Sequence, residues 1–149
     1  MIDTDNYLEN IKTEIINGNA KVVAKNYQIN NVKLTMNYNI GKQLAEAGKH
    51  YGEGIVKKYA KELTEEFGKG YTFTELTRMK QFYDLSQKVA PVGQLLTWSH
   101  YKLLLPLKNV EEIKYYISIT KRDNLSKRAL AERIKSNEYG RLSTEAKEK

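Results

Sequence analysis

The chain has 149 residues, a net charge of +7 and no cysteine, which excludes disulfides, thiolate metal sites and cysteine nucleophiles. Its two histidines, His50 and His100, are too few for a zinc site without added carboxylates, so we expect no metal and no cofactor. The N-terminus is acidic and no run of about 18 apolar residues occurs, so we expect a cytoplasmic protein with no membrane partner.

The positive charge is carried by the body of the chain, because the first twenty residues are acidic overall. A basic body favours a polyanionic partner such as nucleic acid. The alternative is a solvated, lysine-rich surface that binds nothing. Charge does not separate these two interpretations, so the pattern of the helices must be considered.

A first amphipathic helix is predicted near the N-terminus, over residues 4–17. Leu8, Ile11 and Ile15 recur at helical spacing and lie on one face, which we expect to be buried. Gly18 follows the last of them and is expected to end the helix.

A long helix without a strong breaker is predicted over residues 20–47. Small and aromatic residues recur along it every 3.5 residues on average, as in a seam between helices, and Asn31 lies inside the seam. The seam packs either on the rest of the chain or on a second copy, so a homodimer through 20–47 is one alternative. The seam consists of Ala20, Ala24, Tyr27, Asn31, Leu34, Tyr38, Gly41 and Ala45.

The next two helices are marked by clear local signals. A helix over 54–67 is expected to end at Gly68, because only glycine adopts the left-handed conformation at little cost. Thr72 with Glu75 three residues later matches a capping box, so a further helix should run over 73–85.

The helix over 73–85 is predicted to have two different faces, at about 100° per residue. Its apolar face should contain Phe73, Leu76, Met79, Phe82 and Tyr83. Its opposite, outward face should contain Thr74, Thr77, Arg78 and Gln81.

Three shorter helices are predicted in the last third of the chain. The first begins near Thr97 or Ser99 and stops at Pro106, the second covers 110–122, and Ser126 opens the third. No strand pattern competes with these helices, so the fold class is all-α.

Together these elements predict a helical domain with a long N-terminal helix and a helix-turn-helix core. We divide the chain into an N-terminal helical arm over 1–47, a helix-turn-helix domain over 48–142, and a frayed tail over 143–149.

The two helices joined by the turn GKGY have the layout of a helix-turn-helix, in which the second helix enters the major groove. Arginine pairs with guanine, glutamine pairs with adenine, and threonine offers a hydroxyl or contacts a thymine methyl. Lysines and the amides at the start of the helix are suited to phosphates. Basic residues that open the last helix are a second candidate for phosphate contact, or a solvated face. The residues predicted to contact DNA are Lys69, Thr72, Thr74, Thr77, Arg78, Lys80, Gln81, Lys127 and Arg128.

Other chemistries have less support in the sequence. Trp98, Ser99 and His100 adjoin one another, but no nucleophile, base and orienting group are arranged together, so a packed and hydrogen-bonded histidine is favoured. Glu112 and Lys114 resemble the E-x-K element of metal-dependent nucleases, yet this segment is expected to be helical. No small-molecule substrate is evident.

Four segments of the chain resemble the N-terminal domain of the YhcG-type PDDEXK nucleases, over about residues 35–142. The resemblance implies a helical, winged-helix-like DNA-binding module, with the metal site in a separate C-terminal nuclease domain. The segments are YNIGKQLAE with YGEGIVKKYAKEL, then FGKGYTFTELTRMKQFY, LTWSHYKLLLPLKN and LSKRALAERIKSNEYGRL.

The resemblance depends on particular positions, and it stops before the nuclease half. Because the sequence ends at Lys149, no catalytic residue of such a nuclease can be assigned and we expect no enzyme activity. The matching positions are Gly70, Tyr71, Phe73, Leu76, Met79, Phe82, Tyr83, Trp98, Ser99, His100, Tyr101, Ser126, Leu130, Ile134, Tyr139 and Arg141.

A fainter likeness to the helix-turn-helix of ParB-type partition proteins also places recognition on the helix over 73–85. The sequence therefore predicts a module that binds double-stranded DNA. The alternative function is a helical oligomerisation or protein-interaction module that uses the helix over 20–47.

Overall fold

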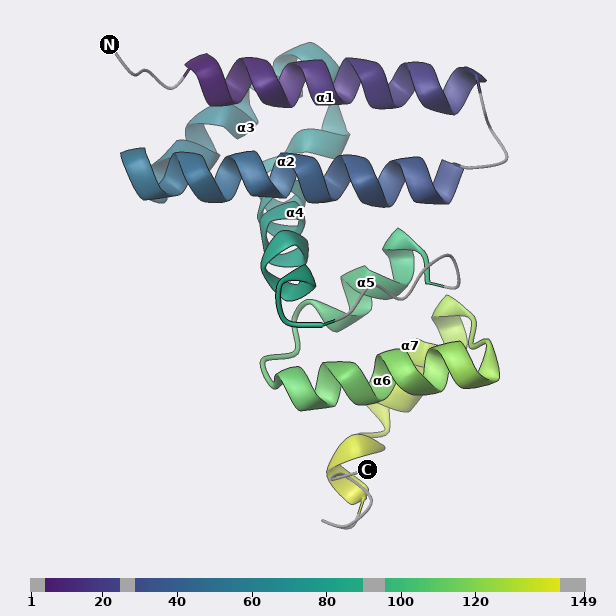
Figure 1. Ribbon diagram of the computed structural model, residues 1–149. Helices are drawn as coiled ribbons and strands as arrows, with labels where there is room; N and C mark the ends of the chain where they lie inside the picture. Colours follow the sequence, from purple (N-terminus) through teal and green to yellow (C-terminus); the bar gives the residue numbers. More distant parts are fainter. Residues whose placement is uncertain (1–4, 25–28, 90–95, 143–149) are drawn as a thin grey trace. The chain divides into compact units, whose positions relative to one another are not determined.

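The structure is a computed structural model that describes residues 5–24, 29–89 and 96–142. These residues form seven α-helices and two 3-10 turns, with no strand among them (Figure 1). The predicted all-α class is confirmed. The chain divides into two compact units, which we call the N-terminal unit (Met1–Gln87) and the C-terminal unit (Lys88–Lys149).

The residues that the structure describes in the N-terminal unit form four α-helices. The first two lie side by side and the fourth crosses the second (Figure 1). The predicted division between an arm over 1–47 and a domain over 48–142 does not coincide with these units, because the helices of the arm share a core with the two that follow. The helices are α1 (Asp5–Ala24), α2 (Ile29–Tyr51), α3 (Gly54–Phe67) and α4 (Phe73–Ser86).

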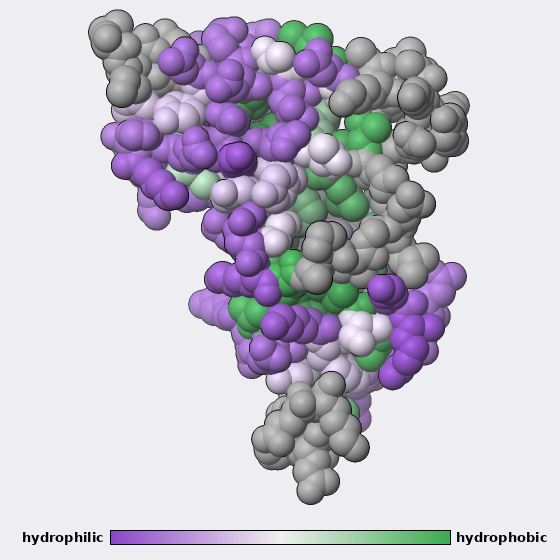
Figure 2. All heavy atoms as spheres, in the orientation of Figure 1, coloured by the Kyte–Doolittle hydropathy of each residue, from purple (hydrophilic) through white to green (hydrophobic). Residues whose placement is uncertain are grey.

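The predicted apolar face of α1 is buried. Leu8, Ile11 and Ile15 all pack inside the N-terminal unit. Lys12 lies beside this face and its ammonium is 3.0 Å from a carboxylate oxygen of Glu66 on α3. An ion pair between α1 and α3 therefore lies at the edge of this core. On the side shown in Figure 2, the residues of α1 and α2 are mostly hydrophilic.

The predicted end of the first helix at Gly18 is wrong, because α1 continues to Ala24. Gly18 is buried, and a Cβ atom built there would overlap Met36 Sδ of α2. The glycine therefore leaves room for the side chain of Met36 and does not terminate a helix. Its cost in helix propensity, about 1 kcal/mol, is offset by packing with α2.

The predicted long helix over 20–47 is also wrong, because its range spans the end of α1 and most of α2. Residues 25–28 lie outside those that the structure describes. The second helix continues past Gly48 to Tyr51, and Gly52 follows it with a φ of 82°. Gly48 is tolerated inside the helix because it is followed by only three more helical residues.

The described part of the predicted seam packs within the chain. Gly41 is buried against α4, and the rings of Tyr38 and Tyr83 lie 5.1 Å apart. The side chains of Ala20, Ala24, Tyr27 and Asn31 lie outside those that the structure describes. Packing inside the chain is thus confirmed for Gly41 and Tyr38, and the homodimer stays a prediction.

The end of α3 at Gly68 is confirmed. Gly68 has φ 97° and ψ −163°, a backbone region that is essentially restricted to glycine, and its amide donates to the carbonyl of Thr64 at 2.9 Å. The 3-10 turn Lys69–Tyr71 follows directly and leads into α4. This glycine therefore sets the geometry of the turn between α3 and α4.

Replacing Gly68 with alanine is expected to lower the free energy of unfolding by about 1–3 kcal/mol, because alanine is strained in this backbone region. A Cβ atom at Gly68 would meet no atom within 4 Å, so backbone strain is the only cause. Gly70 is a matched control, since it lies in the same turn, has no positive φ and has equally open space. Denaturant unfolding should show Gly70→Ala unchanged or stabilised by up to about 1 kcal/mol. Equal losses in both variants would contradict this account.

The described part of the C-terminal unit contains three α-helices, and the predicted starts of all three are confirmed. The side chains of Thr97, Asn109 and Ser126 each accept a backbone amide from the first turn of the helix that follows. The tail over 143–149 lies outside the described residues. The elements are α5 (Trp98–Leu104), α6 (Val110–Asp123), α7 (Lys127–Lys135) and the 3-10 turn Tyr139–Arg141.

Candidate nucleic-acid interface

The helix α4 begins as predicted and presents polar residues outward. The hydroxyl of Thr72 accepts the amide of Glu75 at 3.3 Å, which fixes the first turn. Thr74 and Gln81 are exposed and Thr77 is half-buried. Leu76 and Met79 are buried on the opposite face, and Phe82 and Leu85 are also buried, towards the C-terminal end of α4.

Phe73 does not lie on the buried face of α4, contrary to the prediction. Its side chain is 49% exposed. In an ideal helix Phe73 is about 180° from Phe82 and about 40° from Thr77, so it belongs to the outward face. Tyr71 of the preceding turn is buried instead. Its ring lies edge-on to the ring of Phe67, with 6.0 Å between the two ring centroids. The outward face of α4 therefore carries an aromatic ring.

Arg78 lies at the edge of the outward face and is engaged within its own helix. Its Nη1 donates to Glu75 Oε1 at 2.6 Å, and its side chain is 39% exposed. Only half of the predicted capping box is seen, because the carboxylate of Glu75 pairs with Arg78. A half-buried pair within one helix contributes about 1 kcal/mol, so Arg78 can leave it for a stronger partner at modest cost.

The two lysines predicted beside this helix differ in exposure. Lys69 is exposed in the turn before α4, and Lys80 is half-buried near Gly48 of α2. Asp84 is exposed near the other end of the helix. The positive charge is thus concentrated around the first two turns of α4, where the amides of Phe73 and Thr74 have no helical partner.

The other two predicted DNA contacts, Lys127 and Arg128, lie on α7 in the C-terminal unit. Both are exposed in the first turn of α7. The predicted contacts therefore form two separate groups, one on α4 and one on α7.

The histidine at the start of α5 is packed and hydrogen-bonded, as predicted. His100 is buried, its Nδ1 accepts the amide of Thr97 at 3.0 Å, and its Nε2 is 2.8 Å from the carbonyl oxygen of Leu125. The neutral tautomer with hydrogen on Nε2 satisfies both contacts. His100 thus ties the start of α5 to the turn between α6 and α7.

The E-x-K segment is helical, as predicted. Glu112 and Lys114 lie on α6 and not on the edge of a sheet. Among the described residues, no group of three histidine, aspartate or glutamate side chains is placed to hold a metal ion.

Comparison with known families accounts for most of the chain. A family model described as the DUF1016 N-terminal domain matches residues 10–141. The chain belongs to the DUF1016 family. No curated protein and no solved structure matches it. No helix in the described ranges of this DUF1016 domain is long and apolar enough to cross a membrane.

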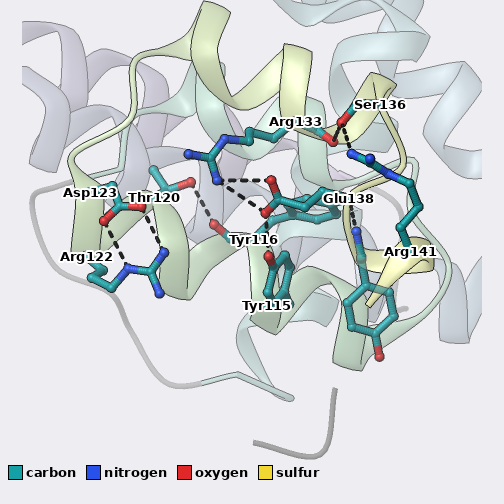
Figure 3. Close-up of polar contacts among 10 residues, drawn as sticks. Tyr115, Tyr116, Thr120, Arg122, Asp123, Arg133, Ser136, Glu138 and Arg141 are labelled. Atoms are coloured by element: carbon teal, nitrogen blue, oxygen red, sulfur yellow. Dashed lines mark hydrogen bonds and ion pairs between the residues drawn. The ribbon is translucent and has the colours of Figure 1, made fainter. Parts of the chain in front are cut away.

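The residues matched by the DUF1016 family model contain a polar network that the sequence did not indicate. Tyr115 donates its hydroxyl hydrogen to Glu138, and Arg133 Nη1 lies 3.1 and 3.2 Å from the two carboxylate oxygens of Glu138 (Figure 3). The amide of Tyr139 donates to the hydroxyl of Tyr116 at 3.2 Å. This network holds the last 3-10 turn against α6 and α7. Tyr115 and Tyr116 each lie 23 residues before their partners, which is too far apart in sequence for a spacing rule to detect.

Alkaline pH tests the network in the DUF1016 domain. Burial and the hydrogen bond to Glu138 raise the pKa of Tyr115 to about 12, because ionisation would place a phenolate beside a carboxylate. The folded pKa exceeds the ordinary value of about 10, so the contribution of Tyr115 is complete below pH 10 and is lost as the pH approaches 12. We expect Tyr115→Phe to cost about 1 kcal/mol near pH 8.

The difference in unfolding free energy between wild type and Tyr115→Phe should shrink as the pH rises from 10 to 12, because only the wild type has Tyr115 to ionise. The other tyrosines titrate in both proteins, so their effect cancels in this difference. Glu138→Gln keeps an acceptor but removes the carboxylate charge, so its stability should depend less on pH in this range. A difference that stays constant up to pH 12 would contradict the network.

Proposed function

We propose that this DUF1016 N-terminal domain binds double-stranded DNA, in the cytoplasm, with the outward face of α4. The observation that carries the proposal is that this face is left uncovered within its compact unit, while the rest of α4 packs tightly. A capped helix with an uncovered polar face is the element that a helix-turn-helix inserts into the major groove.

Each side chain of this face has a matching partner on duplex DNA. Gln81 can pair with adenine, and Thr74 and Thr77 can donate a hydrogen bond or contact a thymine methyl. Phe73 adds an apolar surface suited to a thymine methyl at the start of the helix. Arg78 reaches a guanine only by leaving Glu75.

The remaining residues predicted to contact DNA near α4 have two roles, which are to bind phosphates and to fix where the helix begins. Lys69 and Lys80 flank the first turns of α4, where unpaired amides also attract a phosphate. The hydroxyl of Thr72 is used as the helix cap, so its part in the proposal is to set the start of α4.

The resemblance to YhcG-type nucleases supports a targeting role. In such proteins an N-terminal helical module would bring a separate nuclease domain to DNA. For the residues of this chain we propose binding and not catalysis.

The decisive experiment measures the affinity of the chain for labelled duplexes, including a randomised pool, at about 50 and 200 mM salt. Replacing both Thr74 and Gln81 with alanine should weaken binding to the preferred duplex about tenfold or more. The matched control is Thr13→Ala with Gln43→Ala, since both residues lie away from α4. Unchanged binding by the α4 variant would refute the assignment.

Failure of the wild-type chain to retard any duplex at about 50 mM salt would favour the interaction module instead. Light scattering would then report the mass in solution, and so whether the chain forms the homodimer predicted for residues 20–47.

A further inference from the structure

The connection between α6 and α7 is itself a helix-turn-helix. Three residues, 124–126, separate the two helices. Asn124 adopts the left-handed conformation at φ 51° and ψ 51°, and the hydroxyl of Ser126 accepts the amide of Ala129 at 3.1 Å. One residue therefore ends α6 and another begins α7, as in a compact motif of this type.

The outward face of α7 is strongly basic. Lys127, Arg128 and Lys135 are all exposed and lie within about 100° of one another around an ideal helix. Ala131 lies in the middle of this arc, and Leu130 is fully buried on the other side. A small residue between three cations lets the helix backbone approach a polyanion closely.

The three cations of this face are not neutralised by neighbours. None of them takes part in an ion pair within the residues that the structure describes. The neighbouring cations are paired instead, Arg133 with Glu138 and Arg122 with Asp123 (Figure 3). Asp123 and Glu138 are thus paired with cations outside this face, and Glu132 at the edge of the arc is the acid that remains exposed on α7.

The surrounding contacts hold α7 firmly in place. The ring of His100 bonds to the carbonyl of Leu125 in the middle of the turn. The pair of Arg133 with Glu138 and the bond from Tyr115 brace the helix from its inner side. A pre-positioned basic helix loses little entropy on binding, which favours contact with a regular ligand such as duplex DNA.

We infer that α7 is a second duplex-binding surface and that it supplies the sequence-independent part of the affinity. This inference rests on the proposed function, because the ligand is the same duplex. Lys127, Arg128 and Lys135 contact phosphates and release counterions, whereas the side chains of α4 distinguish bases. Salt dependence therefore resides mainly on α7, and sequence preference on α4.

The test compares two triple variants by fluorescence anisotropy on a labelled random duplex and on the preferred duplex. The first variant is Lys127→Ala, Arg128→Ala and Lys135→Ala. The matched control removes the same charge from exposed lysines on other elements, by Lys42→Ala, Lys49→Ala and Lys108→Ala. All six positions are exposed, so circular dichroism and thermal unfolding should show that both variants fold.

The α7 variant should lower the slope of log affinity against log salt by about 2.7 units, because three phosphate contacts at about 0.9 each are lost. Its affinity should fall at least about tenfold on both duplexes, while its preference between them is kept. The control should keep the wild-type slope.

An unchanged slope in the α7 variant would overturn this inference and leave the proposed function standing. A wild-type chain that binds no duplex would overturn both. The α7 variant could instead lose its preference between the two duplexes and keep the wild-type slope of log affinity against log salt. That result would show that α7 reads bases, which also contradicts the division of roles.

Discussion

Replacing Gly41 with alanine is expected to lower the free energy of unfolding by about 3 kcal/mol or more. A Cβ atom at this position would overlap the carbonyl oxygen of Met79 and lie 2.9 Å from Tyr83 Cβ. The obstructing atoms belong mainly to the backbone of α4, which cannot turn away as a flexible side chain does. The two helices must then separate, and the buried contacts between α2 and α4 are lost.

Gly48 provides the matched control for Gly41, since it lies two turns later on the same helix. The nearest atom to a Cβ built there is Lys80 Nζ at 3.9 Å, which is an ordinary contact. Gly48→Ala should therefore gain up to about 1 kcal/mol from helix propensity. Urea unfolding of both variants measures the difference, and a Gly41→Ala protein as stable as wild type would refute the close approach of α2 to α4.

Replacing His100 with alanine is expected to cost about 3 kcal/mol, from an unpaired carbonyl, an unpaired amide and a cavity. The carbonyl is that of Leu125 and the amide is that of Thr97, both of which bond to the buried ring. The loss should appear in the C-terminal unit, so hydrogen exchange should rise in α5 and in the turn before α7.

His50 is the matched control for His100, because the chain has only these two histidines. His50 is exposed and its ring stacks on Tyr7 at 5.9 Å. His50→Ala should therefore cost at most about 1 kcal/mol. If His100→Ala and His50→Ala lost similar amounts of unfolding free energy, the burial and hydrogen bonds of His100 would not contribute to stability as expected.

If α7 carries phosphate contacts, His100→Ala should also weaken duplex binding without touching a ligand. The ring holds the turn from which α7 begins, so its loss would leave the basic face less ordered. The α4 face lies in the other compact unit and should keep its sequence preference.

The starts of the helices were predictable because capping is a local interaction. The hydroxyls of Thr72 and Ser126 bond to amides three residues later, and the side chain of Asn109 bonds to an amide two residues later. Gly68 was predictable for the same reason, since positive φ is a property of one residue. These signals lie within a few residues of sequence and need no knowledge of the fold.

The roles of Gly18 and Gly48 could not be predicted, because a glycine inside a helix and a glycine at its end look alike in sequence. The deciding factor for Gly18 is the position of Met36, eighteen residues later. The break between α1 and α2 was misplaced for this reason.

The composition, the caps and the apolar spacing alone specified a basic, all-helical chain and the register of most of its helices, because these properties depend on single residues and their near neighbours. Packing between distant segments decided that Phe73 is exposed while Tyr71 is buried. Packing also assembled the network around Glu138 and left the cations of α7 unpaired. Such features depend on which surfaces meet in three dimensions, and helical periodicity carries no information about the partner that occupies each face.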